Sequence, residues 1–316
     1  MANPTLHSLL QNLMFRRNAV SSTLAPYVTG FSSATPGNRA DVLGAGPARV
    51  RSKRRERPRL AFGRGVTWNV WLPAIIYLAA IALGESLTEA VDPRAGIIAH
   101  AALLSALIVH ASLTSDQRVY RLLVPLCLAP LIRILSLSMP LGQISIVYWY
   151  AIIAVPLLTA AVLVAQTLKL SRAELGLTLR HPLLQVAICV AGLTFGMAEY
   201  LILRPEPLAA SFTLKAVALP AMILLVATGF AEEFIFRGVM QSASRNALGG
   251  WNILYVSAIF ALLHLGYQSA LDVAFVFAVG GLFAVVARQT GSIIGVTLSH
   301  GLTNITLFLI APFFLA

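Results

Sequence analysis

Charged side chains are scarce in this sequence. Asp, Glu, Lys and Arg make up 11% of its 316 residues, against about a quarter in a typical soluble domain. Hydrophobic residues make up 58%, and the mean hydropathy is +0.81. A soluble domain of this size has too little interior to bury so much apolar surface. The composition therefore predicts an integral membrane protein and excludes a chain that is disordered throughout.

Cysteine is almost absent. The two cysteines, Cys127 and Cys189, both lie in apolar runs, which indicates free thiols. A disulfide-rich secreted scaffold is therefore excluded.

Two familiar hydrolase motifs are also missing. The sequence contains no HExxH, which disfavours a zinc protease of that type. No Gly-x-Ser-x-Gly elbow accompanies a histidine partner, which disfavours a serine hydrolase.

Positive charge is concentrated at the amino-terminal end. Residues 1–66 carry a net charge of +9, whereas the rest of the chain carries +2. No fold signature accompanies this charge, so we interpret residues 1–64 as a disordered cytoplasmic tail attracted to anionic lipid, and we expect no nucleic-acid partner. An Arg- and Ser-rich organellar transit peptide and a mis-assigned start codon are alternatives that the sequence leaves open.

From residue 66 onward the chain is a series of apolar stretches of about 17–25 residues, the length that crosses a bilayer as a helix. This pattern predicts an all-α fold, a polytopic membrane helix bundle with about eight or nine transmembrane helices. The expected spans are 67–84, 95–113, 120–138, 144–166, 183–203, 212–234 (continuing as a polar helix to about 247), 251–266, 270–288 and 291–314.

The basic residues also predict an orientation. If the tail is cytoplasmic, the internal loops hold eight further basic residues, whereas the external loops hold three, Arg94, Arg204 and Lys215. Cytoplasmic loops normally carry the excess of Lys and Arg. We therefore expect a cytoplasmic amino terminus, with the plasma membrane as the location if the protein is bacterial.

Ionisable residues inside apolar spans are costly and so indicate functional sites. Glu232 and Glu233 lie near the end of the sixth stretch, and Arg237 follows Glu233 at the i,i+4 spacing of a helical ion pair. Adjacent helical side chains point in different directions. Pairing of Glu233 with Arg237 would leave Glu232 less neutralised and suited to act as a general base. A helix end with ordinary interfacial charges is the simpler alternative.

Two histidines follow on later apolar segments. His264 comes four residues after Phe260, and His300 comes four residues before Asn304. His300 and Asn304 therefore share one helical face, where two neighbouring donors suit a developing oxyanion. Taken singly, His264 is also typical of a hydrogen-bonded core residue. The pair of His300 and Asn304 is also typical of simple hydrogen bonding between helices.

These motifs are expected to meet in space. Gly249–Gly250 is the expected turn between the helices that carry Glu232 and His264, and both residues are about equally far from it in sequence. An antiparallel hairpin would bring them to similar depth, although the span lengths place Glu232 nearer the cytoplasmic leaflet and His264 deeper. A third helix, which begins after residue 291, can add His300 to the same region.

The motifs EExxxR, FxxxH and HxxxN, in this order on successive apolar segments, resemble those of the CPBP family of intramembrane proteases. This family includes the type II CAAX prenyl endopeptidases and bacterial Abi-type proteins. The resemblance covers roughly residues 170–310 and extends to the loop of residues 175–177. It implies a protease core at 169–316, preceded by transmembrane helices of unknown role at 65–168.

The resemblance also implies chemical roles. Glu232 and His264 would activate a water molecule, and His300 and Asn304 would form the oxyanion hole. The implied enzyme is a metal-independent intramembrane glutamic endopeptidase without a cofactor. Its partners would be the lipid bilayer and a membrane-anchored or prenylated peptide or protein substrate.

Three further motif residues would support the site. Glu233 and Arg237 would act structurally or electrostatically, and Phe260 would be a packing residue. Two alternatives stay open: the Glu/His/His/Asn set suits zinc as well, and a catalytically silent scaffold or immunity factor could have the same fold. A transporter is disfavoured because the sequence shows no two matching halves.

The other polar residues within the spans are interpreted structurally. His100 and His110 lie ten residues apart in one span and project in different directions, so we do not expect them to form one site. Arg133 is expected to snorkel or to pair within the bundle, and Glu199 to be an ordinary interfacial residue.

Overall fold

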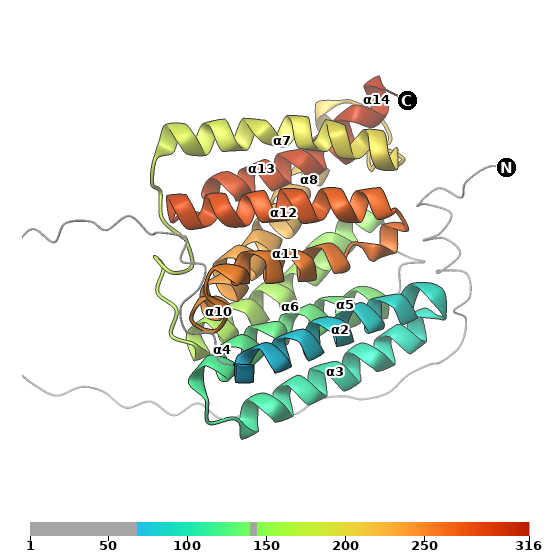
Figure 1. The fold of residues 1–316 in the computed structure, drawn as a ribbon. Coiled ribbons are helices and arrows are strands. Elements are labelled where there is room, and N and C mark those ends of the chain that lie inside the picture. Colours follow the sequence, from blue (N-terminus) through green and yellow to red (C-terminus); the bar gives the residue numbers. More distant parts are fainter. Residues whose placement is uncertain (1–67, 140–143, 316) are drawn as a thin grey trace, which may run out of the picture.

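The computed structural model describes residues 68–139 and 144–315, and all regular elements in these ranges are helical. The helices lie beside one another in stacked rows, with α7 and α13 at one side of the bundle and α2 and α3 at the other (Figure 1). The tail predicted for residues 1–64 lies outside the described residues.

The first five apolar stretches are long helices, the third of which is divided at Cys127. They are α2 (Trp68–Ala90), α3 (Pro93–Leu113), α4 (Gln117–Leu126) with α5 (Leu128–Ser138), α6 (Ile146–Thr167) and α7 (Pro182–Leu203).

The later stretches are less regular because π-helical and 3-10 turns interrupt them. They are α8 (Leu214–Ile223), η2 (Leu224–Phe230), α9 (Ala231–Glu233), η3 (Phe234–Met240), α10 (Gln241–Leu248), η4 (Gly249–Trp251), α11 (Asn252–Leu262), η5 (Leu265–Tyr267), α12 (Ala270–Thr290), α13 (Ile294–Ile305), η6 (Thr306–Ile310) and α14 (Ala311–Phe314).

Eight helical stretches in the described ranges are long and apolar enough to cross a membrane. The sixth, Leu214–Tyr267, is 54 residues long. It turns back at Gly249, whose φ of 60° lies in the left-handed region that favours glycine, and α11 then runs beside α12 (Figure 1). The predicted all-α polytopic bundle and the predicted turn are therefore confirmed.

Large apolar side chains cover the outside of the bundle. Leu72, Ile98, Val155, Leu183 and Met222 are each more than 60% exposed. A soluble protein rarely exposes so much contiguous apolar surface, whereas lipid tails solvate it. The chain is thus an integral, multi-pass membrane protein.

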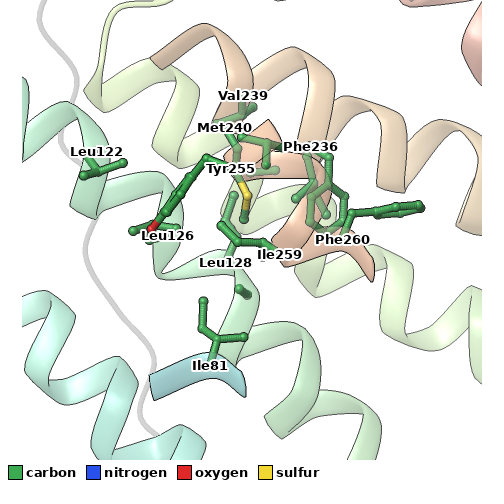
Figure 2. Close-up of a cluster of buried hydrophobic side chains, with 14 of the residues drawn as sticks. Ile81, Leu122, Leu126, Leu128, Phe236, Val239, Met240, Tyr255, Ile259 and Phe260 are labelled. Atoms are coloured by element: carbon green, nitrogen blue, oxygen red, sulfur yellow. The ribbon is translucent and has the colours of Figure 1, made fainter. Parts of the chain in front are cut away.

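One hydrophobic core joins the early spans to the later ones. In Figure 2, Ile81 and Leu126 face the same interior region as Met240 and Ile259. The buried Tyr255 hydroxyl also donates to the carbonyl of Ala74 in α2, at 3.0 Å. The division of the chain at residue 168 stays a prediction, but the two parts pack as one body.

Small residues let α13 approach its neighbours closely. A Cβ atom on Gly192 of α7 would lie 2.2 Å from the carbonyl oxygen of Ser299, and one on Gly229 of η2 would lie 2.8 Å from the backbone nitrogen of Gly301. Such close backbone contact is typical of helix packing in membranes. It fixes α13, which carries His300, between α7 and η2.

The loop between α6 and α7 holds the start of α13. Within the loop, the Ser171 backbone N–H and hydroxyl donate to the Glu174 carboxylate at 2.8 and 2.7 Å. These hydrogen bonds hold the pKa of Glu174 below its usual value because they favour the charged form. The carbonyl of Gly176 then accepts from the backbone N–H of Ile293, at 2.9 Å.

Candidate active site

A cavity inside the bundle brings the predicted motif residues together. It has a volume of about 60 Å³, and its lining includes Glu232, His264, His300 and Asn304. Their elements are far apart in sequence, since Glu232 lies on α9, His264 follows α11, and the other two lie on α13. The turn at Gly249 thus brings Glu232 and His264 to one cavity.

The two adjacent glutamates point to different surroundings. They lie on α9, a short α-helical segment between the π-helical segments η2 and η3, and π-helical turns are frequent at functional sites. The side chain of Glu232 is 31% exposed, whereas that of Glu233 is 0% exposed. Glu232 is therefore the carboxylate that a molecule in the cavity can reach.

Glu233 is held by two partners. Its Oε1 atom accepts from Arg237 Nη1 at 2.7 Å, which is the i,i+4 ion pair expected from the sequence. The same oxygen lies 2.9 Å from His300 Nδ1. An ionised carboxylate only accepts hydrogen bonds, so Nδ1 carries a proton. The other ring nitrogen, Nε2, lies 3.8 Å from Oε2 of Glu232.

The end of α11 explains the spacing of Phe260 and His264. The backbone N–H of His264 bonds to the carbonyl of Ala261 at 2.9 Å, in place of the i−4 carbonyl of Phe260. The ring Nδ1 of His264 takes that vacated partner, at 2.8 Å. A carbonyl accepts only, so Nδ1 donates and Nε2 of a neutral ring is an acceptor.

Asn304 is oriented by the helix that carries Glu232. Its Nδ2 atom donates to the Thr228 hydroxyl at 2.8 Å, and this hydroxyl in turn donates to the carbonyl of Leu224. An amide NH₂ has two N–H donors, so one is left for a molecule in the cavity.

Phe260 packs against three of the motif residues. Its ring centroid lies 4.4 Å from Cζ of Arg237, 4.8 Å from the ring centroid of His264 and 5.9 Å from that of His300. Phe260 is 5% exposed and lines the cavity, whereas the buried Arg237 and Glu233 are not among its lining residues.

Glu199 and Thr228 also line the cavity, and neither was predicted to do so. Glu199 was expected to be interfacial, but it is 8% exposed and lines the cavity, because α7 turns this face toward η6 and α13. Thr228 lies four residues before Glu232 on one helical stretch, and this spacing alone could have predicted that Thr228 shares the face of Glu232. Tyr150 of α6 also lines the cavity, and no pattern in its apolar span marks it.

The remaining wall of the cavity is apolar and aromatic. It is formed by α12 and η6 through Phe275, Val276, Val279, Phe283 and Phe308. Within the described ranges, no group of three or more His, Cys, Asp and Glu side chains is arranged to hold a metal ion. The site combines a reachable carboxylate, a ring nitrogen that can accept and N–H donors, in a cavity whose remaining lining is largely apolar and aromatic side chains.

Residues 213–306 match the family model described as Type II CAAX prenyl endopeptidase Rce1-like. The matched range contains all seven motif residues but not the first five spans or the 175–177 loop. No curated protein and no solved structure matches the chain. The resemblance seen in the motifs is therefore confirmed over this range, which matches the Rce1-like family of type II CAAX prenyl endopeptidases.

Proposed function

We propose that this protein is an intramembrane endopeptidase that uses water activated by Glu232 and His264, without a metal ion. The observation that carries the proposal is the convergence of Glu232, His264, His300 and Asn304, from three separate helical segments, on one cavity. The family match supports a protease of the CAAX type.

In the proposed reaction, a water molecule lies between the Glu232 carboxylate and Nε2 of His264. Glu232 accepts one proton from this water, and the oxygen attacks the carbonyl carbon of a peptide bond. The C–N bond of the resulting tetrahedral intermediate then breaks, and the proton on Glu232 passes to the leaving amine. The immediate products are a carboxylic acid and an amine. The remaining water proton then passes from the acid to the amine, which leaves a carboxylate and an ammonium group, and no covalent enzyme intermediate forms.

His300 and Asn304 are proposed to stabilise the oxyanion. Because Nδ1 of His300 donates to Glu233, Nε2 donates to an oxyanion only when the ring is a doubly protonated imidazolium. Glu233 and Glu232, on the two sides of this ring, favour that charge. The free N–H of Asn304 supplies the second donor.

The substrate is proposed to be a membrane-anchored peptide or protein terminus, prenylated or not. The aromatic and aliphatic wall on α12 and η6 suits a chain or lipid group that is itself dissolved in the bilayer. The scissile bond would lie beside the polar lining residues Glu232, His264, His300 and Asn304.

Proteolysis by purified protein in lipid vesicles tests the proposal. We expect cleavage of at least one of a set of membrane-anchored peptides, including prenylated carboxyl-terminal and leader-type sequences. The rate is expected to be unchanged by EDTA or 1,10-phenanthroline. Inhibition by chelator that zinc reverses would instead assign Glu232, His264 and His300 to a metal site. A cellular phenotype that survives Glu232→Ala would favour a silent scaffold.

We also propose that the amino terminus is cytoplasmic, from the distribution of basic residues. Cysteine labelling checks this in a protein in which Cys127 and Cys189 are replaced by Ala. An impermeant maleimide is expected to label Glu206→Cys in intact cells, but Ala173→Cys only after permeabilisation, since these exposed loop positions flank α7. The reverse pattern would invert the orientation.

A further inference from the structure

A buried ionic cluster joins three of the first helices. Glu85 of α2 is completely buried and accepts two hydrogen bonds from Arg133 of α5, one from Nε at 2.7 Å and one from Nη2. His100 of α3, also completely buried, places Nε2 at 3.2 Å from Oε1 of Glu85. Arg133 therefore pairs within the bundle, as expected. Buried charges in a membrane are costly and mark sites with a function.

Arg133 also reaches the end of the helix that precedes His264. Its Nη2 atom donates to the carbonyl of Leu263 at 2.7 Å, across 130 residues of sequence. Leu263 caps α11, and its carbonyl is one of those at a helix end that lack an intrahelical partner. The next residue along the chain is His264, so this hydrogen bond fixes the backbone from which the His264 ring extends.

Helix α2 holds the rest of the same loop. Oε2 of Glu89 accepts from Gln268 Nε2 at 3.3 Å, and a Cβ atom on Gly266 would lie 3.2 Å from Oε1 of Glu89. Tyr267, between these two contacts, lines the cavity beside His264. The cavity residues His264 and Tyr267 thus lie in a loop that α5 contacts at one end and α2 contacts at the other.

We infer that Arg133, itself held by Glu85, is a positioning residue for His264, so that the amino-terminal helices complete the active site. The inference rests on the proposed role of His264. The His264 ring follows the helix end, where the backbone is no longer held by regular i−4 bonds. Without Arg133, the loop that carries it would sample other conformations, and displacement by about 1 Å can cost about 10²-fold in rate.

Matched variants separate positioning from general stability. The double variant Glu85→Gln/Arg133→Met removes both charges, so that no unpaired charge stays buried. Its control is Arg121→Met. Arg121 makes the same kind of contact, from Nη2 to the carbonyl of Leu168 at the end of α6, at 2.9 Å, and it does not line the cavity.

Kinetics on a cleaved peptide give the first readout. The double variant is expected to lower kcat by about tenfold to 10²-fold, with KM changed by less than about twofold, because the apolar wall that binds the substrate is untouched. Arg121→Met is expected to keep both constants. A double variant with unchanged kcat, or an equal loss in the control, would overturn the inference.

Hydrogen–deuterium exchange in lipid nanodiscs gives a second readout that needs no substrate. Amide exchange in residues 264–269 is expected to rise by about tenfold or more in the double variant, whereas exchange in α12 and α13 stays as in the wild type. Unchanged exchange in 264–269 would overturn the inference, even if proteolysis were never detected. A protein that cleaves nothing but shows the local increase would contradict the proposed function alone.

Discussion

Glu232→Gln is expected to lower kcat for peptide hydrolysis by about 10²–10⁴-fold, the range that a general base contributes. The amide of glutamine has nearly the same shape as the carboxylate but does not take a proton from water. The Glu232 side chain is 31% exposed, and its buried neighbour His300 keeps Glu233 as a partner, so the replacement leaves no buried charge unpaired. The melting temperature is therefore expected to stay close to that of the wild type.

Its neighbour Glu233 supplies the matched comparison. Glu233→Gln would remove the partner of the buried Arg237 guanidinium, whose side chain is 0% exposed. Loss of one partner of a buried ion pair typically costs about 3–5 kcal/mol, so this variant is expected to melt at a clearly lower temperature. Kinetics and thermal melting of both variants in nanodiscs make the comparison. An active Glu232→Gln protein would contradict the assignment of the base.

Local spacing was enough to predict the contacts within one helix. The i,i+4 pattern of Glu233 and Arg237 gave the ion pair seen at 2.7 Å, and glycine at 249 marked the turn that brings Glu232 and His264 to one cavity. The spans were predictable because a bilayer requires long apolar helices, whose internal hydrogen bonds satisfy the backbone.

Contacts between helices were not predictable from the same patterns. The approach of His300 to Glu233 spans 67 residues, and that of Arg133 to Glu85 spans 48. In a soluble helix, the polar face shows which side is outward. In a membrane helix, lipid and protein interior are both apolar, so the sequence does not show how each helix is rotated about its axis.

Polar residues inside the spans predicted inward-facing positions better than the apolar pattern did, because each polar side chain needs a partner. For Glu199 and Glu85, however, the sequence did not show whether the side chain faces inward. Each stands near the end of its helix, where an interfacial position is equally compatible with the sequence, and only the packing of neighbouring helices turns it inward. The π-helical segments around Glu232 were not predictable either, since no residue type marks them.

Asn304→Ala is expected to lower kcat by about 10²–10³-fold, the usual effect of removing one oxyanion donor, with little change in KM. Asn304→Asp, which keeps the size but replaces donors with acceptors, is expected to be at least as inactive. Thr228→Val is the comparison variant. It removes only the hydroxyl that accepts from Asn304 Nδ2 at 2.8 Å, so it is expected to lower kcat less than Asn304→Ala does.

The ratio of kcat to KM effects decides what Asn304 does. A donor that acts only on the oxyanion stabilises the transition state and not the bound substrate, so its loss lowers kcat and kcat/KM equally. Asn304→Ala with raised KM and unchanged kcat would mean that the amide binds the ground-state carbonyl instead. If Thr228→Val were as inactive as Asn304→Ala, the orientation of the Asn304 amide by Thr228 of η2 would be as important as the donor itself. The close packing of Gly229 against Gly301, which holds η2 against α13, would be the structural basis of that orientation.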